Sequence, residues 1–147
     1  MRCFRINFPI SGLPEYQARN NPSGISSFDT YGHIDYIVRY GPNKNRDYSY
    51  RKYADIFDEI LKQLISREIG MEINTGGYHY GLGEPNPCTD IIRRYRELGG
   101  EIITIGADAH TPEKIGYAFD KAAQVLTACG FRYYTIFKNR KPEFVTL

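Results

Sequence analysis

Two short segments of the sequence place ligand-type side chains two residues apart, each directly after an apolar run typical of a β-strand. Asp108 and His110 follow the run at 101–105, and His33 and Asp35 close an earlier run of the same kind. Side chains at positions i and i+2 of an extended segment point to the same side, so each pair can converge on one ligand. A carboxylate oxygen and an imidazole nitrogen both suit zinc, manganese or iron at about 2 Å. The spacing therefore predicts a divalent-metal site.

Each of these residues also has a simpler interpretation. Asp108 could cap the helix that follows it, and His110 could form a hydrogen bond at the surface. His33 could be a hydrogen-bonded histidine of the core. However, two of the three histidines in the chain lie at the carboxyl ends of expected strands, which favours one shared metal centre formed by His33, Asp108 and His110.

The expected secondary structure explains why these pairs should meet. Apolar runs predict strands over 28–34, 71–74, 101–105 and 132–137, and i, i+3, i+4 stripes predict helices over 53–65, 89–98 and 112–129. Residues 143–147 are expected to form a short extra strand or a tail. Helices of crossover length between strands are typical of a parallel sheet with right-handed connections. Ligands of such sheets bind beyond the carboxyl ends of the strands, where both polar pairs stand.

Composition and charge exclude several classes of function. At 147 residues with 41% hydrophobic content, the chain suits a single domain. A formal net charge of +2 with interspersed signs provides no basic stripe for nucleic acid. The apolar runs are far shorter than the roughly 20 residues that span a bilayer, so we expect no membrane partner and a cytoplasmic location. Three widely spaced cysteines indicate reduced thiols rather than a disulfide framework.

Four ordered segments of the sequence together resemble one enzyme family. They are FDTYGHIDYIVRYG, MEINTGGYHYGLGEPNP, YRELGGEIITIGADAHTPEKIGYAF and GFRYYTIFKNRKP. They resemble the carboxyl-terminal half of histidinol-phosphate phosphatases of the polymerase and histidinol phosphatase (PHP) superfamily, from about residue 28 to residue 147. The resemblance implies a distorted barrel of seven strand–helix units, with up to three divalent metals at its carboxyl-terminal face. The implied reaction is hydrolysis of L-histidinol phosphate to L-histidinol and phosphate in histidine biosynthesis.

The resemblance also assigns roles to individual residues. His33 matches the metal ligand of the family's GHxD motif, and Asp108 and His110 match the ligands of its final DxH motif. The implied nucleophile is water activated by the metals. We therefore expect zinc, manganese or iron as the cofactor and no catalytic residue separate from the metal ligands.

The sequence departs from the family in what precedes residue 28. Family members begin with a strand that ends in HxH, followed by a metal-bridging glutamate and further histidines, whereas the histidines here occur only at positions 33, 79 and 110. We therefore expect an α/β fold that is a partial PHP-type barrel, with about four parallel strands over 28–147 and the amino-terminal strands missing. Residues 1–27 are expected to form an irregular arm. The metal cluster would then be incomplete and the phosphatase weakly active.

Further residues are candidates for substrate contact. A phosphate monoester needs cationic or amide donors, and the glycine-rich loop at 76–81 offers both, with His79 where family members often carry a basic residue. Arg39 and Arg140 follow expected strands and are also phosphate-binding candidates, although all three residues could simply be solvated. Three polar residues could orient the metal ligands from a second layer of contacts: Asp35, Glu72 and Asn74. The tyrosines lie mostly on apolar stripes and are expected to serve packing.

Two alternatives to a histidinol phosphatase stay open at this point. The chain could be another phosphoesterase of the same superfamily, although the missing basic groove disfavours a polymerase-associated exonuclease. It could instead be a catalytically silent half-barrel that persists as an oligomerising protein. An open parallel sheet leaves edge strands and an apolar inner face to cover. We therefore expect a homodimer or a missing amino-terminal half as the protein partner, besides a small phosphate monoester as the substrate.

Overall fold

A parallel β-sheet forms the centre of the fold in the computed structural model, which describes residues 28–147. The sheet contains β1 (Thr30–Tyr31), β2 (Gly70–Asn74) and β3 (Ile103–Gly106), paired in the order β1-β2-β3. Both pairings are parallel, so the predicted α/β class and parallel sheet are confirmed. The arm predicted over 1–27 lies outside the described residues.

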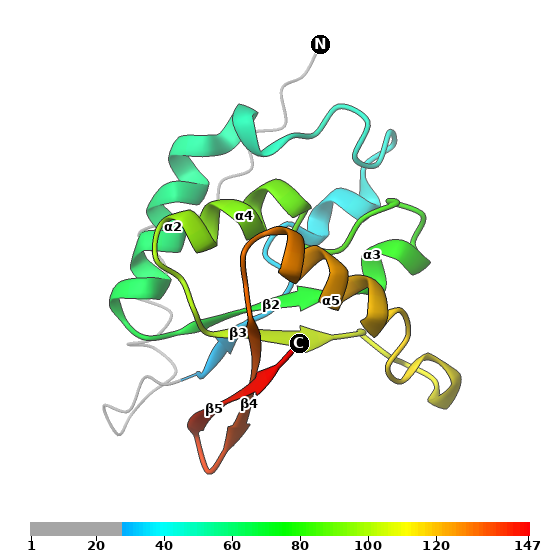
Figure 1. The fold of residues 1–147 in the computed structure, drawn as a ribbon. Helices are drawn as coiled ribbons and strands as arrows, with labels where there is room; N and C mark the ends of the chain where they lie inside the picture. The colour runs from blue at the N-terminus through cyan, green and yellow to red at the C-terminus, as the bar shows by residue number, and fades with distance from the viewer. Residues whose placement is uncertain (1–27) are drawn as a thin grey trace, which may run out of the picture.

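Helices cover one face of this sheet (Figure 1). The α-helices are α2 (Ala54–Ser66), α3 (Gly76–His79), α4 (Thr89–Glu97) and α5 (Phe119–Ala128), and the 3-10 helices are η1 (Tyr36–Tyr40), η2 (Tyr50–Tyr53) and η3 (Pro112–Lys114). The apolar stripe predicted for α2 is confirmed by four buried residues at helical spacing: Phe57, Ile60, Leu61 and Leu64. Within residues 28–147, no helix is long and apolar enough to cross a membrane.

The core lies between the helices and the apolar side of the sheet. Met71, Ile73 and Ile103 belong to β2 and β3 and are fully buried. Leu61 of α2 and Leu126 of α5 join the same apolar cluster. Burial of each such side chain stabilises the fold by roughly 1.5–3 kcal/mol. The packed helices therefore hold the sheet as a rigid platform for the residues that follow its strands.

The opposite face of the sheet is polar. Thr30, Glu72 and Thr104 alternate with the apolar residues and therefore point to this side. Thr30 Oγ1 lies 3.2 Å from Thr104 Oγ1, although their strands flank β2 on opposite sides. Strands two apart in a flat sheet are separated by about 9.5 Å, so the contact requires the sheet to curve. The predicted apolar inner face is wrong for the described residues, because strand alternation directs Met71 and Ile73 towards the helices.

The last two strands form a separate antiparallel hairpin (Figure 1) of β4 (Tyr133–Lys138) and β5 (Lys141–Thr146). The expected fourth parallel strand is therefore wrong in its pairing, whereas the strand alternative for residues 143–147 is confirmed. Asn139 and Arg140 have φ values of 50° and 64°, as a tight two-residue hairpin turn requires. β4 still contacts β3, because Thr135 Oγ1 accepts the Ile103 N–H at 3.2 Å.

The first predicted strand is shorter than expected. Of the run at 28–34, only Thr30–Tyr31 pairs with β2. The chain then turns at His33, whose φ is 26°, and enters η1. A positive φ cannot continue a strand, so His33 and Asp35 lie on a turn rather than on an extended segment.

The helix predicted over 112–129 is interrupted. Gly116 and Ala118 have φ values of 72° and 54°, which lie outside the helical region and delay the start of α5 until Phe119. Ile115, expected in the buried stripe of this helix, is 76% exposed. The interruption therefore leaves an irregular loop between the end of β3 and α5.

Candidate functional site

The candidate site lies where the chain leaves β3, at the carboxyl end of the sheet. Asp108 has a φ of 48°, so the segment is not extended and the predicted alternation of its side chains does not hold. The two predicted ligands still face each other, because His110 Nε2 lies 3.4 Å from Asp108 Oδ1. The Asp108 side chain is 22% exposed and that of His110 is 75% exposed. The pair is therefore open to solvent on the imidazole side.

Arg39 neutralises Asp108 from another side of the site. Its Nη1 donates to Asp108 Oδ2 at 3.0 Å, between residues 69 positions apart in the chain. Burial by itself would raise the pKa of Asp108, but the hydrogen bond and charge of Arg39 outweigh burial and hold the pKa below its ordinary value. The charges of His110 and His33 contribute in the same direction. The carboxylate is therefore ionised near neutral pH and can serve as an anionic ligand.

Three tyrosine rings enclose Arg39. The guanidinium carbon lies 4.3 Å from the ring centre of Tyr36, 4.8 Å from that of Tyr40 and 4.1 Å from that of Tyr80. Arg39 also donates to the Tyr40 hydroxyl at 2.8 Å, and only 11% of its side chain is exposed. Its Nε is buried without a hydrogen-bond partner among residues 28–147. A largely buried arginine with a spare donor is suited to bind an anion.

One sequence signal could have revealed part of this cage. Tyr36 and Tyr40 lie three residues before and one residue after Arg39, on the same 3-10 helix. Tyr80 follows α3 and has no such sequence link to the arginine. Its contact with Arg39 joins the end of α3 to η1. The start of α3 lies close to the end of β3, since a Cβ on Gly76 would lie only 3.4 Å from the Cβ of Asp108.

His33 belongs to the same neighbourhood. Its ring centre lies 4.6 Å from that of Tyr36, the residue that also covers Arg39. Its charge contributes to the lowered pKa of Asp108, so the imidazole lies within electrostatic range of that carboxylate. The structure therefore brings His33, Asp108 and His110 to the same end of the sheet.

The described residues offer part of a metal site rather than a complete one. No group of three or more His, Cys, Asp or Glu side chains between residues 28 and 147 is arranged to hold a metal ion. Asp108 and His110 supply a carboxylate and an imidazole that face each other, which suits zinc, manganese or iron. A cation bound there would compete with the Arg39 guanidinium for the carboxylate. A metal centre with His33 as a third ligand stays a prediction.

Glu72 and Asn74, the polar residues of β2, are hydrogen-bonded to each other and lie beside the site. Asn74 Nδ2 donates to Glu72 Oε1 at 2.8 Å, and Asn74 Oδ1 accepts the Gly76 N–H at 2.8 Å. The Glu72 carboxylate fills the space beside Gly106, where an added Cβ would collide with it. Glu72 therefore reaches the end of β3, two residues before Asp108. Its role in orienting a metal ligand stays a prediction, as does that of Asn74.

Asp35 is a buried carboxylate with 3% exposure. It accepts hydrogen bonds from the side chain of Asn86, the N–H of Cys88 and the hydroxyl of Tyr48. Burial raises the pKa of Asp35, and these three hydrogen bonds oppose the rise. Its side chain is therefore tied to loops beside the site rather than to the predicted metal ligands.

His79 lies at the end of α3, where its Nε2 contacts the Lys114 ammonium of η3. Its ring meets those of Tyr80 and Tyr117 edge-on, with ring centres 5.3 Å and 6.1 Å away. Lys114, which the sequence does not single out, adds an ammonium group beside this predicted phosphate contact. Tyr80 contacts both His79 and Arg39, so these two phosphate-binding candidates share one neighbouring ring.

Arg140 lies at the opposite end of the sheet. Its Nη2 donates to Asp29 Oδ1 at 2.9 Å, and Asp29 immediately precedes β1. The structure therefore does not bring Arg140 together with Asp108. We leave Arg140 out of the proposed site for this reason.

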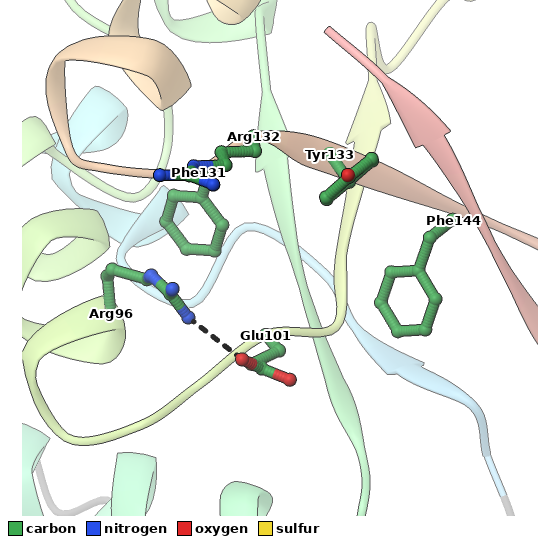
Figure 2. Close-up of a pocket in the computed structure, with 6 residues that line it drawn as sticks. All are labelled: Arg96, Glu101, Phe131, Arg132, Tyr133 and Phe144. Carbon is green, nitrogen blue, oxygen red and sulfur yellow. Dashed lines mark hydrogen bonds and ion pairs between the residues drawn. The ribbon is translucent and has the colours of Figure 1, made fainter.

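A pocket also opens at the amino end of the sheet (Figure 2). It has a volume of about 330 Å³ and is lined by Arg96, Glu101, Phe131, Arg132, Tyr133 and Phe144. Arg96 pairs with Glu101 at 3.3 Å and donates to the carbonyl oxygens of Gly100 and Gly130. None of the residues predicted for metal or phosphate lines this pocket, which is separate from the candidate site.

Comparison with known proteins identifies similar enzymes, although no family model matches the chain. A probable histidinol-phosphatase from Clostridium acetobutylicum is 37% identical over 107 residues, covering 71% of this chain and 40% of that protein. A histidinol-phosphatase from Lactococcus lactis is 30% identical over 117 residues, covering 80% of this chain and 43% of that protein. The chain is therefore similar to part of these histidinol-phosphatases. It spans about two fifths of the length of these curated relatives.

A solved histidinol phosphate phosphatase shares the fold. The crystal structure of the Lactococcus lactis enzyme, complexed with zinc, L-histidinol and phosphate, matches this chain with a TM-score of 0.72 and 26% sequence identity. The match covers 90% of this chain and 47% of the Lactococcus chain. The described helices and sheet therefore correspond to part of a histidinol phosphate phosphatase fold.

Proposed function

We propose that the chain carries the carboxyl-terminal half of a metal-dependent histidinol phosphatase site, which hydrolyses L-histidinol phosphate to L-histidinol and phosphate. One observation carries the proposal. Arg39, Asp108 and His110 converge at the carboxyl end of β3 in a chain that resembles a histidinol phosphate phosphatase over 90% of its length. That relative was crystallised with zinc, L-histidinol and phosphate, which supports the same ligand classes here.

We also propose that the sheet is a segment of a PHP-type barrel. Curvature that brings the Thr30 and Thr104 hydroxyls together supports this, as do helices gathered on one face (Figure 1). In a barrel of strand–helix units the helices lie outside and the strands enclose the interior. The outer edge of β1 pairs with no strand among residues 28–147. A further strand, from a complementary half or from a second copy of the chain, is the partner that we propose for this edge.

The proposed chemistry divides between a metal and the residues of this chain. Asp108 and His110, with His33 as a third ligand, would hold zinc, manganese or iron, which when bound polarises phosphoryl oxygens and lowers the pKa of water. Arg39 and His79 would bind the phosphate oxygens. The tyrosine cage of Arg39 holds its planar guanidinium in place and partly shields it from water, which strengthens its attraction for an anion.

The described donors also explain the weak activity that we propose for this chain alone. Catalytic zinc sites usually use three protein ligands and one water. Asp108 and His110 face each other, but no third ligand, His33 included, is arranged with them among residues 28–147. With two ligands in place the site would bind its metal weakly, so only a small fraction of molecules would be loaded.

Phosphate release from L-histidinol phosphate tests this proposal. We expect slow turnover by the purified chain with zinc or manganese, and its complete loss in Asp108→Asn. Asp58→Asn, which alters a carboxylate remote from the site, is the matched control and should retain the turnover of the wild type. Absence of any Asp108-dependent turnover with either metal would contradict the proposal and favour a silent half-barrel. Equal turnover of unrelated phosphate esters would favour another phosphoesterase.

A further inference from the structure

A buried polar network begins at the turn after β1. Asp35 Oδ1 accepts the Asn86 side-chain amide at 2.8 Å, while Oδ2 accepts the Cys88 N–H at 2.8 Å and the Tyr48 hydroxyl at 3.1 Å. Both carboxylate oxygens are thus held by neutral donors. A buried carboxylate without a cationic partner is costlier than an apolar side chain of similar size. Packing alone therefore does not account for an aspartate at this position.

Asn86 connects this carboxylate to the two longer strands of the sheet. The Asn74 backbone N–H donates to the backbone carbonyl oxygen of Asn86 at 2.7 Å, and the Asn86 backbone N–H donates to that of Asn74 at 2.9 Å. The next residue, Thr75, donates its N–H to the Gly106 oxygen at 2.8 Å. A path of hydrogen bonds and one peptide unit therefore joins Asp35 to the end of β3.

The same aspartate also begins the turn that carries two proposed site residues. Asp35 is the N-cap of η1, and its backbone oxygen accepts the Val38 N–H at 3.0 Å. His33 lies two residues before it, and Arg39 lies within η1. Arg39 reaches Asp108 with one hydrogen bond of 3.0 Å. The pairing therefore depends on where this short turn sits relative to the end of β3.

We infer that Asp35 is a positioning residue, whose carboxylate fixes the 33–40 turn against the 86–88 loop so that Arg39 and His33 keep their places beside Asp108. The inference rests on the proposed function only where it assigns metal binding to His33 and phosphate binding to Arg39. Loss of the carboxylate would release the turn without removing any group that contacts metal or phosphate.

Two variants and one control separate positioning from general stability. Asp35→Asn replaces one carboxylate oxygen, an acceptor, by an NH2 group, a donor that would face the donors already present around Asp35. Tyr48→Phe is milder, because it leaves two of the three hydrogen bonds to Asp35 in place. Asp58→Asn is the control, because Asp58 also accepts from a tyrosine hydroxyl, that of Tyr50 at 2.6 Å, but links α2 to Arg94 of α4. All three are made in the full 147-residue chain.

Two measurements read the position of the turn. Ring-labelled histidine in NMR spectra reports His33 among only three histidines, and titration with inorganic phosphate reports the anion site. We expect Asp35→Asn to shift the His33 signals and weaken phosphate binding about tenfold, by analogy with the loss of outer contacts at other sites. Tyr48→Phe should change both readouts in the same direction but less. Asp58→Asn should lower the melting temperature and leave both readouts unchanged.

Unchanged His33 signals in folded Asp35→Asn would overturn the inference, and so would equal changes in Asp58→Asn, since the effect would then be structural only. If Asp35→Asn does not fold, Tyr48→Phe decides by the same two readouts. Failure of the wild-type chain to bind phosphate would count against the proposed function. The His33 signals would still decide whether Asp35 positions the turn.

Discussion

Two aspartate–arginine pairs in this chain differ in how many of their hydrogen-bond donors and acceptors have partners. Asp58 of α2 accepts three hydrogen bonds from Arg94 of α4, the shortest of 2.6 Å, and one from the Tyr50 hydroxyl. Both partners sit on helices that pack against each other. This pair has little remaining capacity for a ligand and serves to join two helices.

The Asp108–Arg39 pair is incomplete by comparison. A single hydrogen bond joins the two residues, Asp108 Oδ1 faces His110, and the Arg39 Nε has no partner among residues 28–147. Neither residue lies on an α-helix or a strand. The comparison teaches that a pair held on turns, with unused donors and acceptors, is the one suited to exchange its partner for a metal or a phosphate.

The largest expected effect comes from breaking the incomplete pair at its carboxylate. Asp108→Asn removes a charged ligand, and loss of even an outer contact typically costs 10- to 100-fold in metal affinity, so we expect zinc affinity to fall at least about 100-fold. Isothermal titration with zinc measures this change, with Asp58→Asn as the control. Equal affinity in the wild type and Asp108→Asn would show that zinc binds elsewhere.

Breaking the complete pair should change stability instead. Asp58→Asn removes the nearer of two charged partners of Arg94, which also pairs with Glu97. Both side chains are partly exposed, so we expect the free energy of unfolding to fall by only about 1 kcal/mol at neutral pH. The hydrogen bond from Arg94 lowers the pKa of Asp58 to about 2. A lowered pKa in the folded state means that this stabilisation is present above about pH 4 and is lost as the pH falls towards 2.

Urea denaturation of the wild type and Asp58→Asn across this pH range measures the effect. The difference between the two proteins should shrink as the pH falls from about 4 to about 2, since protonated aspartate and asparagine both lack the charge. A difference that stays constant with pH would mean that the ion pair is not its source.

Sequence patterns predicted the elements whose residues have one clear periodicity. The α2 stripe that includes Leu61 and Leu64 formed as expected because every fourth or third position is apolar. The helix through Ile115 was wrong because its apolar spacing continued across Gly116 and Ala118, whose positive φ values interrupt the helix. Periodicity does not report such a break, since it depends on how the loop packs after β3.

The proximity of two predicted site residues could be expected from the sequence, but their surroundings could not. Motif spacing identified Asp108 and His110, which do face each other. No local pattern could reveal that Arg39 binds Asp108, because 69 positions separate them and the curved sheet brings them together. The same holds for Tyr80, whose contact with Arg39 depends on the packing of two loops.

A smaller effect is expected from the arginine side of the incomplete pair. Arg39→Gln should weaken phosphate binding about tenfold, the loss of roughly one charge-assisted hydrogen bond. Arg39→Lys should not restore it, because an ammonium cannot lie flat among three tyrosine rings. Phosphate titration followed by NMR gives both affinities. Full recovery in Arg39→Lys would show that charge alone matters and that the cage does not.

The smallest effect is expected from Arg140, which lies at the other end of the sheet. Its ion pair with Asp29 is exposed to solvent, and exposed ion pairs contribute little to stability. Arg140→Gln should therefore unfold almost as the wild type does and bind phosphate with unchanged affinity. Reduced phosphate affinity in this variant would place Arg140 in the site after all.

Anomalous diffraction from crystals grown with zinc and phosphate tests the central claim most directly. We predict a zinc ion within about 2.0–2.2 Å of an Asp108 oxygen and a His110 nitrogen. We also predict that phosphate lies against the Arg39 guanidinium inside its tyrosine cage. Zinc bound away from both residues, with Arg39 still paired to Asp108, would contradict the account.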